Sequence, residues 1–87
     1  MREIIFERKA ARALDSLSPE IRQQVERDII ALALDRDSVA AQIAPLQGFE
    51  ASRLRSGDWR IIFTENPTFV RVLFIGHRKD IYRKGLS

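Results

Sequence analysis

The sequence predicts an α+β domain in which two N-terminal helices, an αα-hairpin, pack on an antiparallel β-sheet of about four strands. Two observations support this fold class. Apolar residues recur at helical spacing between residues 7 and 34, whereas residues 49–76 contain β-favouring runs separated by turn residues. The 87 residues suffice for one small core, so residues 1–87 are predicted to form a single domain with chain order β-α-α-β-β-β.

The N-terminal half supplies the first strand and the first helix. Residues 2–6, "REIIF", are a short apolar run with β-branched residues, which is typical of a strand. Residues 7–17 are rich in helix formers. Their apolar positions at helical spacing are Ala10, Ala13, Leu14 and Leu17.

A second helix is expected to begin at the sequence "SPE". Ser18 can cap it, Pro19 suits the first turn, and Glu20 complements the helix dipole. The apolar stripe that follows consists of Ile21, Val25, Ile29 and Leu32. The helix is expected to end between Leu34 and Ser38.

The C-terminal half predicts an antiparallel meander. Residues 44–48 contain Pro and Gly and are expected to form a loop. Residues 52–55 and 59–63 are expected strands joined by the hairpin turn "SGD", and residues 64–68 are a second turn. Residues 69–76, "FVRVLFIG", are almost wholly apolar and predict a central strand buried on both faces. The first strand can add to this meander.

Composition excludes several classes of protein. There are no cysteines, which excludes disulfides and thiolate metal sites. No apolar run approaches the roughly 20 residues that span a membrane, and the N-terminus lacks the features of a signal peptide. We therefore expect a soluble cytoplasmic protein.

Positive charge is concentrated in the C-terminal part. Residues 1–50 contain seven Lys and Arg and nine Asp and Glu, a net charge of −2, whereas residues 51–87 contain eight and three, a net charge of +5. This asymmetry suits a polyanionic partner, such as nucleic acid or an acidic protein segment. A basic, solvated face is the alternative interpretation.

Three arginines lie in the expected hairpin. Alternate residues of a strand share a face, so Arg53 and Arg55 are expected to lie together on the face opposite Leu54. The simplest register buries Leu54, Trp59, Ile61 and Phe63 and turns the arginines outward. Antiparallel pairing can then bring Arg60 near Arg53 or Arg55, an arrangement suited to a phosphate between the guanidinium groups. Each arginine alone could equally pair with an acid or face water.

These residues resemble a known toxin superfamily. The stretch "LQGFEASRLRSGDWRIIF", followed by an apolar strand ending in "IGHRKDIYR", resembles the RelE/ParE toxins of bacterial type II toxin–antitoxin systems. The expected order of elements fits the RelE-like fold as well, so the likeness covers nearly the whole chain.

The resemblance implies a metal-independent endoribonuclease that needs no cofactor. RelE-type members cleave mRNA in the ribosomal A site, where the ribose 2′-hydroxyl attacks the adjacent phosphate. The site residues that the resemblance implies are Arg53, Arg60, Arg78 and Tyr82. Arg60 and Arg78 would stabilise the developing phosphate charge, and Tyr82 would orient the scissile nucleotide and share in proton transfer.

The general base is open at this stage. Better-studied members carry lysines where this chain has Ala51 and Arg53, and an arginine does not give up its proton. Glu50 and His77 are the candidates, and His77, the only histidine, carries a side chain suited to proton transfer near neutral pH. Because adjacent strand residues face opposite ways, His77 can share a site with Arg78 only if the strand breaks there.

Further residues are assigned to substrate binding or to packing. Trp59 is expected in the core, while the ring of Phe49 could pack or stack on a base. The predicted substrate-binding residues are Arg55, Lys79, Arg83 and Phe49.

Three functions remain open from the sequence. The first is the ribosome-dependent RNase, the second is a ParE-type inhibitor of DNA gyrase, and the third is an inactive relative that binds only an antitoxin. Both toxin hypotheses imply a cognate antitoxin that neutralises the chain, with the helix pair as its expected docking site. The RNase hypothesis adds the ribosome and mRNA as partners, and none of the hypotheses involves a membrane.

Overall fold

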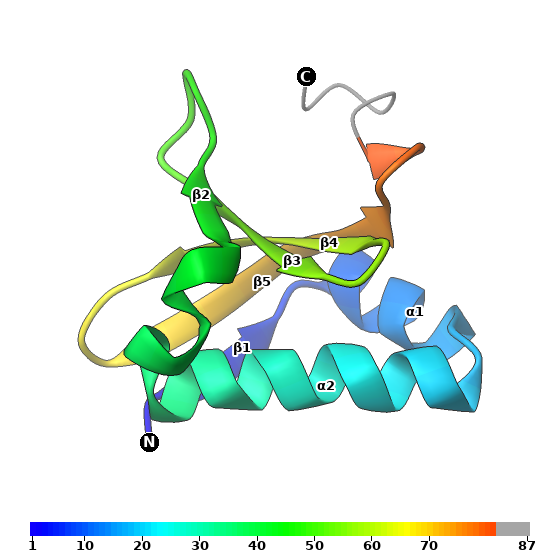
Figure 1. Cartoon of the computed structure of the whole chain (residues 1–87), viewed down its shortest axis with the longest axis horizontal. Helices are drawn as coiled ribbons and strands as arrows, with labels where there is room; N and C mark the ends of the chain where they lie inside the picture. Colours follow the sequence, from blue (N-terminus) through cyan, green and yellow to red (C-terminus); the bar gives the residue numbers. More distant parts are fainter. Residues whose placement is uncertain (82–87) are drawn as a thin grey trace.

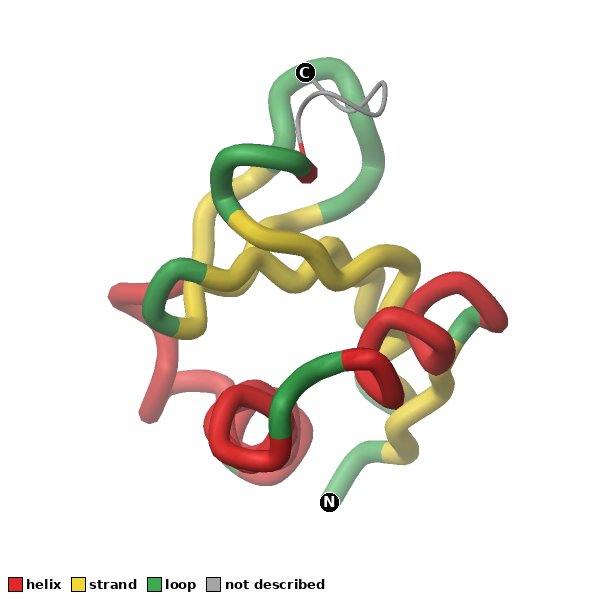
Figure 2. The backbone as a smooth tube through the Cα atoms, turned by 90° about the vertical axis from the view of Figure 1, so that its right-hand side faces the viewer, coloured by secondary structure: helices red, strands yellow, loops and turns green. Residues whose placement is uncertain are grey.

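Helices lie on one face of a mixed β-sheet in the computed structural model, which describes residues 1–81 (Figures 1 and 2). The elements are β1 (Glu3–Phe6), α1 (Arg8–Ser16), α2 (Pro19–Leu34), the 3-10 helix η1 (Arg36–Gln42), β2 (Ile43–Pro45), β3 (Ser52–Ser56), β4 (Trp59–Glu65) and β5 (Phe69–His77). Within the described residues, five strands form a sheet in the order β1-β5-β4-β3-β2. The α+β class is confirmed and both expected helices form, but the helix arrangement differs from the expected pair because a 3-10 helix, η1, follows α2.

The two helices form close to where the sequence predicts them. In α1, Ala10 and Leu14 are buried, and in α2 the stripe of Val25, Ile29 and Leu32 faces the sheet. Pro19 and Glu20 occupy the first turn of α2 as expected, but the Ser18 hydroxyl makes no capping hydrogen bond. The helix therefore begins without a side-chain cap, and its first backbone hydrogen bond runs from the Arg22 amide to the Ser18 carbonyl at 2.8 Å. None of the helices formed by residues 1–81 could cross a membrane.

The expected four-stranded antiparallel sheet is wrong in two respects. The strands number five across residues 1–81, and β1 runs parallel to β5, with Glu3 opposite Phe69 and Phe6 opposite Val72. A direct hairpin would force antiparallel pairing. The helices and the remaining strands lie between β1 and β5 along the chain, so they supply the long crossover that a parallel pair requires.

The additional strand, β2, overlaps the start of the expected loop 44–48. β2 pairs antiparallel with β3, and its Pro45 lies opposite Ser52. Proline cannot donate a ladder hydrogen bond, but β2 is an edge strand and therefore tolerates it. The preceding 3-10 helix η1 was likewise not expected from the sequence.

The sheet is packed on both faces near its centre. On the helix face, Leu54, Ile61 and Phe63 are fully buried and join the core formed by the helices. On the outer face, Ile62 packs with Leu46 and Ile81.

The strand of residues 69–76 is interior, as predicted, because it lies between β1 and β4. Its burial on both faces is only partial, since Leu73 and Phe74 on the outer face are half-buried. A register shift at Ile62 and Phe63 lies opposite this point and leaves both Leu73 and Phe74 on the outer face. The most completely buried strand is therefore β4.

Two arginines clamp Glu65 where β4 ends. Arg2 Nη1 lies 2.8 Å from Glu65 Oε1, and Arg36 Nε lies 2.9 Å from Glu65 Oε2. Arg2 also donates to the Leu32 carbonyl at 2.8 Å, so the cluster joins the N-terminus, α2, η1 and β4. Partial burial alone would raise the pKa of Glu65, but hydrogen bonds and charge from Arg2 and Arg36 outweigh it and lower the pKa below its ordinary value of 4.5.

This clamp predicts a pH-dependent contribution to stability. A carboxylate with a lowered pKa stabilises the fold above its unfolded-state pKa, and that contribution is lost as the pH falls through the folded-state value. Glu65→Gln should lower the free energy of unfolding at pH 7 by about 1–3 kcal/mol, with a smaller loss in acid. Urea denaturation at several pH values measures this effect. The control variant Glu26→Gln removes an exposed carboxylate of α2 and should change the free energy of unfolding little. Equal losses of this free energy in both variants would contradict the role of Arg2 and Arg36 at Glu65.

Candidate functional site

The pairing of β3 with β4 places two arginines side by side. Arg55 lies directly opposite Arg60 in the antiparallel register, while Leu54 opposite Ile61 points to the helix face. The sequence left open whether Arg53 or Arg55 would meet Arg60, and the structure selects Arg55. Arg53 lies one pair further along the same face, opposite Ile62. Like charges opposite one another destabilise a sheet unless an anion compensates them.

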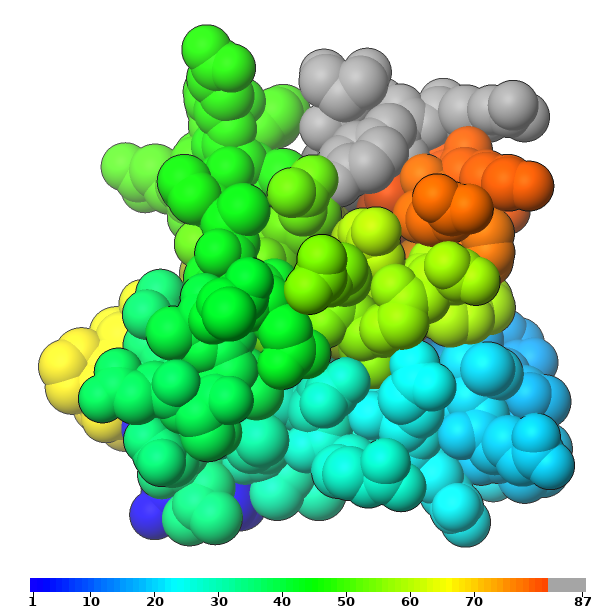
Figure 3. All heavy atoms as spheres, viewed as in Figure 1, coloured from blue at the N-terminus to red at the C-terminus, as the bar shows by residue number. Residues whose placement is uncertain are grey.

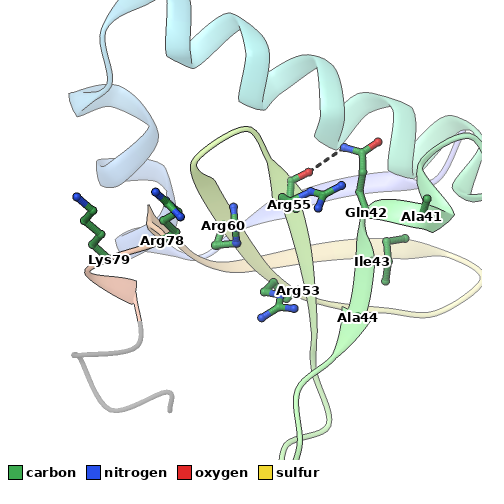
Figure 4. Close-up of a pocket in the computed structure, with 9 residues that line it drawn as sticks. All are labelled: Ala41, Gln42, Ile43, Ala44, Arg53, Arg55, Arg60, Arg78 and Lys79. Carbon is green, nitrogen blue, oxygen red and sulfur yellow. Dashed lines mark hydrogen bonds between the residues drawn. The ribbon is translucent and has the colours of Figure 1, made fainter.

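These arginines line a pocket of about 430 Å³ (Figure 4). Its cationic lining comes from β3, β4 and the segment that follows β5, and consists of Arg53, Arg55, Arg60, Arg78 and Lys79. Among the described residues, no carboxylate lines the pocket. An open concave site with five cations can bind a phosphate group and stabilise charge that grows on it.

The wall of the pocket opposite Arg78 and Lys79 comes from the end of η1 and from β2 (Figure 4). It consists of Ala41, Gln42, Ile43 and Ala44. The Gln42 side chain donates to the Arg55 carbonyl at 2.8 Å, which ties this wall to β3. The sequence does not predict this wall, because no local pattern shows that β2 will pair with β3 and bring the end of η1 beside it.

Arg60 and Arg78 are both held by the β3–β4 turn. Arg60 Nη1 donates to the carbonyl oxygens of Gly57 at 2.9 Å and of Trp59 at 3.0 Å. The Arg78 amide donates to the Asp58 carbonyl at 2.8 Å, and Arg78 Nε lies 3.4 Å from Asp58 Oδ1. The turn therefore holds together one cation from β4 and one from the segment that follows β5.

His77 is not brought into this pocket. It lies opposite Trp59 in the ladder, and the two rings meet edge to face with centroids 5.4 Å apart. Its Nδ1 accepts a hydrogen bond from the Lys79 amide at 3.2 Å. Since Trp59 packs against the helix-side core, His77 lies on that side of the sheet, while Arg78 beyond the strand end lines the pocket.

The remaining predicted residues divide into three groups. Lys79 and Arg55 line the pocket. Phe49, whose side chain is 48% exposed, and Glu50 lie in the β2–β3 loop, which projects from the body of the protein (Figure 3), and neither lines the pocket. Tyr82 and Arg83 lie outside the described residues.

Comparisons with solved structures identify this architecture. The chain is similar to a chain of the RelB–RelE antitoxin–toxin complex from Methanococcus jannaschii, with 21% identity and a TM-score of 0.71 over 93% of this chain and 98% of the other. A chain of the toxin–antitoxin complex RelBE2 from Mycobacterium tuberculosis is 25% identical, with a TM-score of 0.68 over 88% of this chain and 98% of the other. A variant of the Escherichia coli toxin RelE in the free state is 15% identical, with a TM-score of 0.69 over 93% of this chain and 87% of the other.

The chain has the fold of the RelE-like toxin superfamily. The fold that the resemblance implied is thereby confirmed. No protein-family model matches the chain, and no curated protein is significantly similar to it in sequence. The RelE-like fold is thus retained here with few identical residues.

The close approach of Arg55 and Arg60 predicts a conflict between stability and anion binding. Replacing Arg55 with Gln removes the repulsion, so the free energy of unfolding should rise by about 0.2–1 kcal/mol at low salt and less at high salt. The same change should weaken stabilisation by inorganic diphosphate, because one guanidinium group is lost from the pocket.

Thermal unfolding at two salt concentrations, with and without diphosphate, measures both effects. Arg27→Gln, which removes an exposed charge of α2, is the control and should affect neither stability nor diphosphate binding. A destabilised Arg55→Gln variant that keeps its full response to diphosphate would contradict the repulsion and the shared anion site together.

Proposed function

We propose that this chain is the toxin of a type II toxin–antitoxin system and that it cleaves mRNA in the ribosomal A site. The observation that carries the proposal is the convergence of five cations in one open pocket on a RelE-like fold. A polyanion is the natural ligand of such a pocket, and a guanidinium fork matches the geometry of a phosphate group.

The proposed reaction is a transesterification within the RNA chain. The ribose 2′-oxygen forms a bond to the adjacent phosphorus, and the bond from phosphorus to the 5′-oxygen breaks. The 2′-hydroxyl loses a proton and the leaving 5′-oxygen gains one, which yields a 2′,3′-cyclic phosphate and a free 5′-hydroxyl. Negative charge grows on the phosphate oxygens during the attack, so nearby fixed cations accelerate the reaction.

The pocket suggests a role for each of its cations. Arg60 and Arg78 are the proposed catalytic residues that stabilise the phosphate charge, because the turn holds both of them in place. Arg53, Arg55 and Lys79 would bind the flanking backbone of the RNA. Tyr82 keeps its predicted role in orienting the nucleotide and transferring a proton. His77 and Glu50 are left out of the mechanism, because neither lines the pocket.

A cognate antitoxin is the proposed protein partner. The similar structures include antitoxin–toxin complexes, and α2 exposes apolar side chains that a partner could cover. Ile30 is 47% exposed and Leu34 is 66% exposed, and both lie on this helix. Their exposure agrees with the expectation that the antitoxin docks on the helices.

Loss of either proposed catalytic arginine should remove most of the activity. Arg60→Ala and Arg78→Ala should each lower mRNA cleavage by about 10²-fold or more, because each removes charge stabilisation from the transition state. Primer extension on an mRNA in a reconstituted translation reaction measures the cleavage. Arg27→Ala, an equal loss of charge on an exposed part of α2, should leave cleavage unchanged, and circular dichroism should show all three variants folded.

The same experiment decides between the toxin classes. New 5′ ends at the A-site codon that require ribosomes and vanish in the Arg60→Ala variant support the RNase. An intact mRNA with unimpaired translation would reject it, and a supercoiling assay with DNA gyrase would then test the ParE-type alternative.

A further inference from the structure

The β3–β4 turn is attached to the helix layer by Gln24. This residue is half-buried in α2, and its Nε2 donates to the Ser56 carbonyl at 2.9 Å and lies 3.3 Å from the Ser56 hydroxyl oxygen. Ser56 is fully buried and is the last residue of β3. An unsatisfied polar group at such a position is costly, so the Gln24 amide fixes where β3 ends relative to α2.

The turn that follows Ser56 is also packed against Gln24. Gly57 has a φ of 60°, a conformation that other residues rarely adopt. A Cβ atom at Gly57 would lie 2.6 Å from Gln24 Nε2, so the backbone of the turn approaches the amide closely. Gln24 therefore restrains the turn by a hydrogen bond at Ser56 and by direct packing at Gly57.

The restrained turn carries two carbonyl groups that accept hydrogen bonds from Arg60 and Arg78. The Gly57 carbonyl accepts from Arg60 Nη1, and the Asp58 carbonyl accepts from the Arg78 amide. A shift of the turn would displace both acceptors, and thus both guanidinium groups, in the same step. A displacement of about 1 Å in a catalytic group can cost as much as 10²-fold in rate.

We propose that Gln24, on the helix face of the sheet and outside the pocket, is a positioning residue for Arg60 and Arg78. It acts through the β3–β4 turn, and it makes the geometry of the cationic pocket depend on where α2 lies. This inference rests on the proposed function for its catalytic consequence, but its structural part can be tested without RNA.

The test compares Gln24→Leu with Val25→Ala. The first variant removes the amide that reaches the turn, and the second removes buried volume from the helix-side core at the next residue of α2. Amide hydrogen exchange of the full chain follows two hydrogen-bonded amides. The Arg78 amide donates to the Asp58 carbonyl, and the Glu7 amide donates at 2.9 Å to the carbonyl of Val72, the fourth residue of β5. Gln24→Leu should speed the exchange of Arg78 about tenfold relative to Glu7, whereas Val25→Ala should leave this ratio unchanged.

Cleavage kinetics of the same proteins supply the second measurement. Gln24→Leu should lower kcat about tenfold and change KM less than about threefold, because the pocket keeps its charge but loses its geometry. Val25→Ala should keep kcat within about twofold at a temperature where circular dichroism shows both variants folded.

Each outcome decides a separate point. An unchanged exchange ratio in Gln24→Leu overturns the proposal, whether or not the protein cleaves RNA. A changed ratio with an unchanged kcat overturns the link from the turn to catalysis. A wild type that does not cleave mRNA rejects the proposed function, while a changed ratio would still support Gln24 as the residue that positions Arg78.

Discussion

The two-residue turn between β3 and β4 is the constraint on which the cationic pocket depends. Ser56 and Trp59 close the turn as a ladder pair, and Gly57 adopts a positive φ at the first central position, where type II′ turns place glycine. This turn sets the register that puts Arg55 opposite Arg60. A shift of one residue would send the arginines to the helix face and expose the core side chains.

The two faces of the sheet thus differ, since one carries the main core and the other carries the cationic pocket. The helix face carries the main hydrophobic core, and the outer face combines a small apolar cluster with a site whose charges repel one another. Functional sites commonly retain such local destabilisation, and packing elsewhere compensates for it. The Glu65 clamp fits this division, because it joins the N-terminus, α2 and η1 to the sheet at the end of β4, in a region that does not line the pocket.

The elements with strong local signals were predictable from the sequence. Helical spacing located α2, and strand alternation with "SGD" located the hairpin and the outward face of Arg53 and Arg55. The strand β2 was missed because Pro45 and Gly48 favour a loop, whereas the parallel pairing of β1 was not predictable because Glu3 pairs with Phe69, far along the chain. The hydrogen bonds of Gln42 to Arg55 and of Gln24 to Ser56 were not predictable either, because each joins residues from different elements of the fold. His77, a catalytic candidate from the sequence, lies beside Trp59 on the helix side of the sheet and does not line the pocket.

In the proposed function, Arg60 and Arg78 act on one phosphate as a unit. A double-mutant cycle on cleavage tests it most directly, with Arg60→Ala, Arg78→Ala and the double variant assayed in the same ribosomal reaction. If both guanidinium groups stabilise the same transition-state charge, the double variant should be scarcely slower than the slower single variant. Losses that multiply in the double variant would show two independent contributions and contradict a shared phosphate site.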